Sequence, residues 1–366
     1  MGRRSLRLLL LALLLLAPSL ARAQGEPPLL RHFFRLPAMF DGQVLALEAM
    51  EIRPRGMGPF PLAVIAHGTP ATTGQRQRYT VEQYGTVATE LARHGFAAVV
   101  VMRRGFGASE GGFAETTGPC GQSRYAEAGM ESARDLHETV RAMAAQPHVD
   151  ARRVIVVGQS AGGFAALALG AQPPPGLAAI VNFAGGRGRF ADRNAVCEPD
   201  KLVAAVAQFG RATRIAALWI YAENDLSFPP ELARAMFQAY RAGGAAAELA
   251  MLPPFRDDGH RLFVDGVERW RPVLDGFLRR LGLPASPPRA LPAPPDGLSE
   301  RGMAAFRAYV SAPQPNKSFA LGPRGAFAWR ADAQPIDGIR QEALALCLQH
   351  DPGCAVVSEV VELGGD

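Results

Sequence analysis

The sequence predicts an α/β fold: a mostly parallel, eight-stranded, doubly wound sheet flanked by helices, followed by a small C-terminal α+β module. Two observations predict it. Short, continuous apolar runs recur along the chain with helical stretches between them, and a proline-rich segment separates the last part from the rest. Continuous hydrophobicity indicates strands buried on both faces, as in a parallel sheet covered by helices.

The first 23 residues have the features of a secretory signal peptide. Three arginines precede an apolar run from Leu8 to Ala17, and Ala21-Arg22-Ala23 supplies a small-residue cleavage site. The run is short for a membrane span, so we expect a mature chain that begins near Gln24 without a stable membrane anchor. This predicts a periplasmic or secreted protein, and an uncleaved N-terminal anchor is the alternative.

Charge and cysteine content narrow the class of protein further. The leader holds four arginines and no acid, so the formal net charge of +5 for 366 residues falls to about +1 in the mature chain. A nucleic-acid partner is therefore not indicated. Four cysteines behind an export signal predict two disulfides.

The first two predicted strands form a hairpin, Phe33 to Phe40 and Val44 to Ile52, because Asp41-Gly42 between them is a turn signal. Six buried strands follow: Leu62 to Ala66, Ala97 to Met102, Arg153 to Val157, Ala178 to Phe183, Leu218 to Tyr221 and Glu248 to Leu252. The predicted helices include Thr80 to His94, Tyr125 to Gln146, Glu231 to Ala242 and Val264 to Leu281.

A G-x-S-x-G motif, Gly158 to Gly162, directly follows the third of these buried strands and precedes an alanine-rich helical stretch. This context is typical of a nucleophile elbow, a tight turn that lifts a serine out of the sheet. Ser160 is the predicted nucleophile. The backbone N–H of Ala161, the next residue, is a predicted donor to an oxyanion.

A serine nucleophile needs a base and an acid to orient that base, each in a loop that follows a strand. Asp225 follows the strand that ends at Tyr221, and His260 follows the strand that ends at Leu252. These are the predicted acid and base. Glu223 is the alternative acid, and Asp257 and Asp258 are expected to form a turn or face solvent.

The loop His67-Gly68-Thr69-Pro70 follows the first buried strand, where a second oxyanion donor is expected. Pro70 has no N–H, so Thr69 is the predicted donor. The alternative is that His67 only ends the strand and Gly68 only permits a turn.

Together these residues resemble the α/β-hydrolase superfamily, in particular secreted bacterial serine hydrolases of the dienelactone hydrolase and prolyl oligopeptidase-like branches. The resemblance covers about residues 30 to 283. It rests on His67-Gly68, on the segment from Arg104 to Gly111, on Gly158 to Gly163, on Asp225 and on Gly259-His260. Dienelactone hydrolases have a cysteine where this chain has Ser160, and no room exists before Phe33 for the β-propeller of prolyl oligopeptidases.

The resemblance implies an exported serine hydrolase that cleaves a carboxylic ester or amide through an acyl-Ser160 intermediate. A serine peptidase of the prolyl oligopeptidase-like type is one alternative, and an inactive envelope-binding protein is another. The partner is then a small-molecule or peptide substrate. No metal-ligand spacing and no dinucleotide fingerprint occur, so no cofactor is expected.

Two cysteines, Cys120 and Cys197, fall in loops that flank the expected mouth of the site, and a disulfide between them would hold both loops. Free buried thiols are the alternative. Four arginines also fall in loops near this mouth. They either favour an anionic substrate or are simply solvated: Arg103, Arg104, Arg187 and Arg189.

The predicted domains are the signal peptide (1–23), the catalytic domain (24–283), a proline-rich linker (284–300) and a C-terminal module (301–366). The module is predicted as ββαβ: strands Lys317 to Leu321 and Ala326 to Arg330, a helix from Gly338 to His350 and a strand from Ala355 to Leu363. A module this small favours a covalent staple, which Cys347 and Cys354 supply. If the protein is instead an inactive binding protein, we expect this module to bind a partner in the cell envelope.

Overall fold

The computed structural model describes residues 29–70, 73–190, 194–285, 292–312, 314–361 and 363–365. The predicted signal peptide lies outside the described residues. Within those ranges, no helix is both long and apolar enough to cross a membrane.

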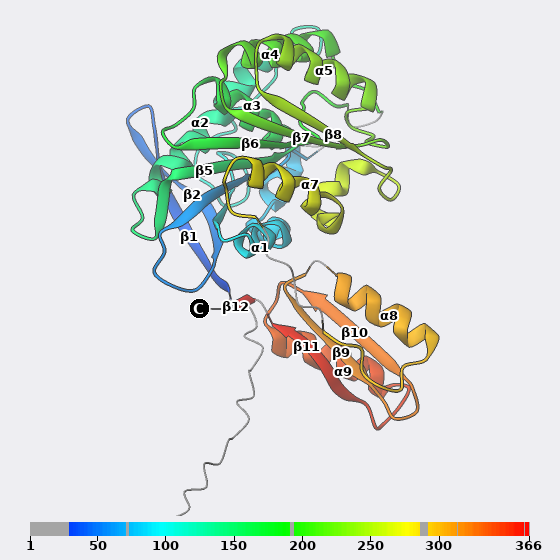
Figure 1. Cartoon of the computed structure of the whole chain (residues 1–366). Coiled ribbons are helices and arrows are strands. Elements are labelled where there is room, and N and C mark those ends of the chain that lie inside the picture. The colour runs from blue at the N-terminus through cyan, green and yellow to red at the C-terminus, as the bar shows by residue number, and fades with distance from the viewer. Residues whose placement is uncertain are drawn as a thin grey trace, which may run out of the picture.

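A mostly parallel sheet forms the centre of the molecule (Figure 1). In the described chain its strand order is β12-β1-β2-β4-β3-β5-β6-β7-β8. The strands are β1 (Leu29–Phe40), β2 (Gln43–Arg53), β3 (Phe60–Ala66), β4 (Ala97–Val101), β5 (Val149–Gln159), β6 (Leu177–Phe183), β7 (Ala216–Ala222), β8 (Ala247–Leu252) and β12 (Leu363–Gly365). Strands β1 and β2 form the predicted antiparallel hairpin, and the pairs from β4 to β8 are parallel.

Helices cover both faces of this sheet, which explains why its central strands are continuously apolar. Along β3, Leu62 and Val64 pack into one core, whereas Ala63 and Ile65 pack into the other. The first core is covered by α2 (Tyr125–Ala144), α3 (Ala161–Ala171), α4 (Pro199–Ala212) and α5 (Pro230–Ala242), and the second by α1 (Gly85–Arg93), α6 (Leu262–Asp265) and α7 (Val267–Arg280). Figure 1 shows these two helical layers on either side of the strands. Three short 3₁₀ helices, Thr73–Arg78, Val81–Tyr84 and Gly259–Arg261, lie in the connections.

The C-terminal residues form a second, antiparallel sheet with the order β10-β9-β11. Its strands are β9 (Asn316–Leu321), β10 (Phe327–Asp332) and β11 (Ala355–Val361), and α9 (Ile336–Leu348) packs against it. A disulfide joins Cys347 in α9 to Cys354 just before β11. The predicted ββαβ order is therefore present, while the predicted domain boundaries stay predictions.

Two elements of this region were not predicted. Helix α8 (Glu300–Ser311) begins at the last residue of the predicted linker, and the Ser299 hydroxyl accepts from the Gly302 N–H at 3.1 Å. Its Phe306 and Tyr309 are buried against Phe319 of β9. The predicted last strand is also divided: β11 ends at Val361, and β12 leaves the small sheet to pair in parallel with β1.

Candidate active site

Ser160 lies at the carboxyl end of β5, between that strand and α3. Its backbone has φ 56° and ψ −122°, a conformation that non-glycine residues seldom adopt. The Ser160 N–H donates to the Phe183 carbonyl of the neighbouring strand β6 at 2.9 Å. This turn has the geometry of a nucleophile elbow, with the serine at the start of a helix of 11 residues.

The two motif glycines are required by close backbone packing. A Cβ on Gly162 would lie 2.2 Å from the Ala66 carbonyl oxygen, and one on Gly158 would lie 2.3 Å from the Gly162 carbonyl oxygen. Real Cβ atoms do not approach backbone atoms this closely, so only glycine lets α3 pack tightly against β3 and β5. The sequence pattern G-x-S-x-G thus records a packing constraint as well as a chemical one.

The predicted acid and base are in contact. The Asp225 carboxylate accepts from His260 Nδ1 at 3.1 Å and from the backbone N–H groups of Ser227 and Phe228 at 2.8 and 2.9 Å. Asp225 is buried, and the His260 side chain is 19% exposed. The buried carboxylate therefore fixes the ring with Nδ1 as donor and leaves Nε2 as the basic nitrogen.

Three polar residues that the sequence analysis did not assign to the site hold the two loops in place. Asp258 Oδ1 accepts from the N–H groups of both Leu226 and His260, at 3.1 and 2.9 Å. The Asn224 side chain bridges to the backbone of Phe255 and Arg256. Gln159, inside the elbow motif, donates to the His260 carbonyl at 2.7 Å. The expectation that Asp258 forms a turn is thus correct but incomplete, because it also ties the acid loop to the histidine loop.

The loop after β3 packs directly against the elbow. A Cβ on Gly68 would lie 3.3 Å from the Ser160 Cβ, and the Gly68 N–H donates to the Tyr84 hydroxyl at 3.0 Å. Thr69 and Ala161 line the same cavity as Ser160. Neither of their backbone N–H groups has an acceptor among the described residues.

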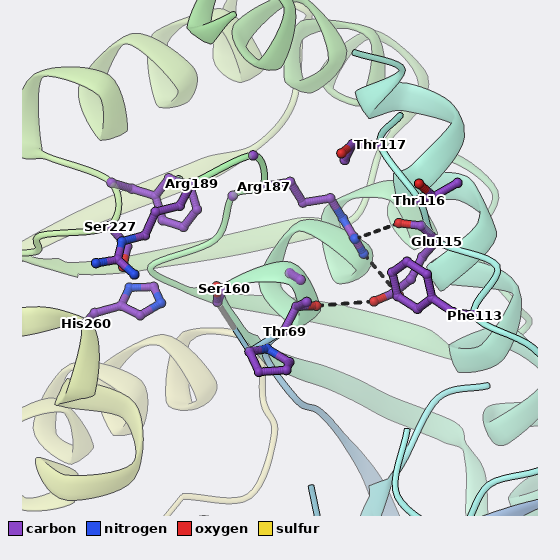
Figure 2. Close-up of a pocket in the computed structure, with 15 residues that line it drawn as sticks. Thr69, Phe113, Glu115, Thr116, Thr117, Ser160, Arg187, Arg189, Ser227 and His260 are labelled. Carbon is purple, nitrogen blue, oxygen red and sulfur yellow. Dashed lines mark hydrogen bonds and ion pairs between the residues drawn. The ribbon is translucent and has the colours of Figure 1, made fainter. Parts of the chain in front are cut away.

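This cavity has a volume of about 280 Å³ and contains Ser160 and His260. Figure 2 shows the His260 ring to the left of Ser160, with Thr69 below and Arg187 above. Three loops supply the other walls. The loop after β4 contributes Phe113, Thr116 and Thr117. The loop after β6 contributes Arg187 and Arg189, and the loop after β7 contributes Ser227 and Phe228. The cavity is large enough for an acyl group and a leaving group of modest size.

The four arginines near the mouth differ in their exposure to solvent. Three of them are buried, so the alternative that all four are solvated loop residues is wrong for these three. Arg103 is fully buried and binds Glu115 through Nε at 2.7 Å, and Arg187 binds the same carboxylate at 3.1 Å. Arg104 is buried against Asp135 on α2. Only Arg189 is exposed. Burial alone would raise the pKa of Glu115, but the two guanidinium groups outweigh it and hold the pKa well below its usual range.

His67 lies under this cluster as a neutral ring. Its Nε2 accepts from the Arg103 N–H at 3.0 Å, so Nδ1 carries the proton and faces the Gly68 carbonyl at 2.6 Å. Burial, reinforced by the charge of Arg103, lowers the pKa of His67 well below its ordinary value of 6.5. His67 thus holds the turn at Gly68. The role of this loop as an oxyanion donor stays a prediction.

The buried neutral state of His67 predicts a pH dependence of stability. Above pH 6.5 the ring is neutral in both folded and unfolded chains, whereas below it only the unfolded chain binds the proton. The free energy of unfolding should therefore decrease by up to about 1.4 kcal/mol per pH unit as the pH falls below 6.5. Urea unfolding of His67→Gln between pH 8 and 5 should give a shallower slope by that amount. An unchanged slope would contradict the assignment, and His350→Gln, just after α9, is the control.

A disulfide joins the loops on two sides of the cavity. Cys120 follows Thr116 and Thr117, Cys197 follows Arg189, and their Sγ atoms are bonded across a sequence separation of 77 residues. Glu198 reinforces the link, because its carboxylate accepts from the N–H groups of Gly121 and Ser123 at 3.0 and 2.9 Å.

The class of protein follows from a strained serine at the carboxyl edge of this sheet: the chain is a serine hydrolase with the α/β-hydrolase fold. A model of the S15 family, described as X-Pro dipeptidyl-peptidase, matches residues 41–246. The match spans more than half of the chain, which therefore belongs to that family. It places the chain within the superfamily that the sequence motifs resemble.

Solved structures are similar to this chain at low sequence identity. An acylaminoacyl peptidase of Pyrococcus horikoshii is 15% identical with a TM-score of 0.50, over 72% of this chain and 43% of that one. A putative dienelactone hydrolase of Klebsiella pneumoniae is 20% identical (TM-score 0.46, 69% and 97% covered), and an esterase of Pyrococcus furiosus is 14% identical (TM-score 0.48, 69% and 91% covered). No curated protein matches the chain.

Proposed function

We propose that the chain hydrolyses a carboxylic ester or amide through an acyl-Ser160 intermediate. Ser160 Oγ attacks the carbonyl carbon while His260 Nε2 takes its proton, and the N–H groups of Thr69 and Ala161 hold the oxyanion. His260 then gives the proton to the leaving group, and Asp225 stabilises the imidazolium throughout. Water attacks the acyl-Ser160 ester, with His260 again as base, and restores the free serine.

One observation carries this proposal: His260, held by the buried Asp225, lines the same cavity as the elbow serine. Each residue comes from a different loop at the carboxyl edge of the sheet, and the side chains of Asn224, Asp258 and Gln159 cross-link these loops. A chain that had kept only the fold for binding would not need this arrangement of donors and acceptors. It argues against the inactive envelope-binding alternative.

Burst kinetics test the intermediate. With p-nitrophenyl acetate, p-nitrophenol should appear in a rapid phase equal to the enzyme concentration, followed by slower turnover as the acyl-enzyme is hydrolysed. Ser160→Ala should show neither phase.

A peptidase is the second candidate because the matching family is described as an X-Pro dipeptidyl-peptidase. If kcat/KM for an X-Pro p-nitroanilide exceeds kcat/KM for p-nitrophenyl acetate, the peptidase activity is favoured.

We also infer export to the periplasm or the medium. The leader-like residues 1–23 and the two disulfides both fit an oxidising compartment. N-terminal sequencing of the protein recovered from those fractions should start near Gln24, and an intact Met1 would contradict it.

A further inference from the structure

The charges that line the cavity are not balanced. Four charged or titratable side chains line it: Glu115, Arg187, Arg189 and His260. His260 is paired with Asp225, and Glu115 is paired with Arg187. Arg189 differs from them, because within the described residues no carboxylate lies within ion-pair distance of its guanidinium.

The wall behind the cavity carries a further excess of positive charge. Arg103 and Arg187 share the single carboxylate of Glu115, and both guanidinium groups are almost completely buried. Arg187 is held in place by Ser132 Oγ at 2.8 Å and by the Glu115 carbonyl at 3.2 Å, yet its Nε has no hydrogen-bond partner in the described structure. Buried charge is poorly screened, so this field acts across the cavity.

Among the described residues, the neighbouring acidic groups form ion pairs with other arginines and none with Arg187 or Arg189. Arg104 is matched by Asp135 and Glu131 on α2, and Arg134 is matched by Glu131 and Asp41. These acidic groups are thus already engaged by arginines of their own. With His260 neutral, the three arginines Arg103, Arg187 and Arg189 face the two carboxylates of Glu115 and Asp225. The site near Ser160 consequently has one positive charge in excess, and Arg189 is its exposed, unpaired arginine.

We propose that the natural substrate carries a carboxylate that pairs with Arg189 when its scissile carbonyl lies at Ser160. This rests on the proposed serine hydrolase and names its substrate class. A guanidinium binds a carboxylate through two parallel hydrogen bonds, which fixes orientation as well as charge. Figure 2 shows the Arg189 side chain reaching toward the Ser227 and His260 side of the cavity, away from the buried Arg187–Glu115 pair. A substrate with an ammonium group beside the scissile bond is disfavoured by the same field.

Two pairs of nearly isosteric esters test the proposal, because each compares a carboxylate with a carboxamide. 4-Acetoxybenzoate and 4-acetoxybenzamide place the group on the leaving side. The acyl-side pair is p-nitrophenyl hydrogen adipate and p-nitrophenyl adipamate, whose longer chain keeps the carboxylate from expelling p-nitrophenol by itself. In at least one pair, kcat/KM for the acid should exceed that for the amide by roughly five- to tenfold at low ionic strength. The pair that shows the preference identifies which side of the substrate carries the carboxylate.

Arg189→Gln should abolish this ratio, and Arg189→Glu should invert it. Arg152→Gln is the matched control, since Arg152 is an exposed arginine near the opposite end of β5, and it should keep the ratio of the parent. Raising the salt concentration from about 0.05 to 0.5 M should reduce the preference in the parent protein.

Binding of the uncleaved esters to Ser160→Ala protein, measured by calorimetry, provides a readout that does not need turnover. A tighter Kd for the acid that is lost in the Ser160→Ala, Arg189→Gln double variant supports the carboxylate site. Equal Kd values for acid and amide in both pairs, or a preference that survives Arg189→Gln, would overturn it. If the protein turns over none of these esters but still binds the acids more tightly than the amides, the carboxylate site stands and the proposed hydrolase chemistry is contradicted.

Discussion

Replacing Asp225 with asparagine is expected to lower kcat for ester hydrolysis about 10⁴-fold and to leave KM near that of the parent. An asparagine fits the same space and can still accept from Ser227 and Phe228, which donate to Asp225 at 2.8 and 2.9 Å. It cannot stabilise the imidazolium that forms in the transition state, and it favours the wrong tautomer of His260. The effect should therefore fall on the chemical step and not on substrate binding.

Glu223→Gln is the matched control for this prediction. Glu223 lies two residues away at the end of β7, is exposed, and was the alternative acid from the sequence. Steady-state kinetics on both variants should show a loss only for Asp225→Asn. A large loss of kcat in Glu223→Gln, with Asp225→Asn near the parent, would assign the acid to Glu223 instead.

Removing the disulfide between Cys120 and Cys197 should lower the free energy of unfolding more than removing the disulfide between Cys347 and Cys354. The Cys120→Ala, Cys197→Ala double variant should lose about 4 kcal/mol in the free energy of unfolding, because the bond closes a long loop in the unfolded chain. It also joins the loop of Thr116 and Thr117 to the loop of Arg189. We therefore expect a several-fold increase in KM, limited by the hydrogen bonds that Glu198 retains.

The second disulfide provides the comparison. Cys347 and Cys354 are separated by only 7 residues and lie in the C-terminal module, away from the residues of the cavity. Their double alanine variant should cost about 2 kcal/mol and leave KM unchanged. Equal effects of the two double variants on KM would show that the Cys120–Cys197 bond does not position the cavity walls. Chemical denaturation and ester kinetics measure both quantities.

The sequence predicted the central sheet well because the strands there are buried on both faces. Runs such as Val154 to Val157 pack one residue into each core in turn, so no polar position interrupts them. The candidate nucleophile, acid and base were also predictable. Each is attached to a strand end by a motif or a loop, and the carboxyl ends of parallel strands meet at one edge of the sheet.

The parts that were not predicted depend on contacts distant in sequence. Nothing local to Arg103 and Arg187 shows that they share Glu115, which follows Arg103 by 12 residues and precedes Arg187 by 72. Strand β12 is three residues long and gains its partner from β1 at the other end of the chain. Helix α8 has a local signal in its capping residue Ser299, but the burial of Phe306 and Tyr309 against the small sheet depends on tertiary packing.

The most direct test of the account is the intact mass of the mature, disulfide-bonded protein after treatment with a fluorophosphonate, beside Ser160→Ala handled identically. We expect one covalent adduct on the parent and none on the variant, because only a serine activated by His260 attacks the phosphorus. An unmodified parent, with both disulfides intact and the fold verified by circular dichroism, would contradict it. An adduct that persists in Ser160→Ala would equally contradict it, since the reactive residue would then lie elsewhere.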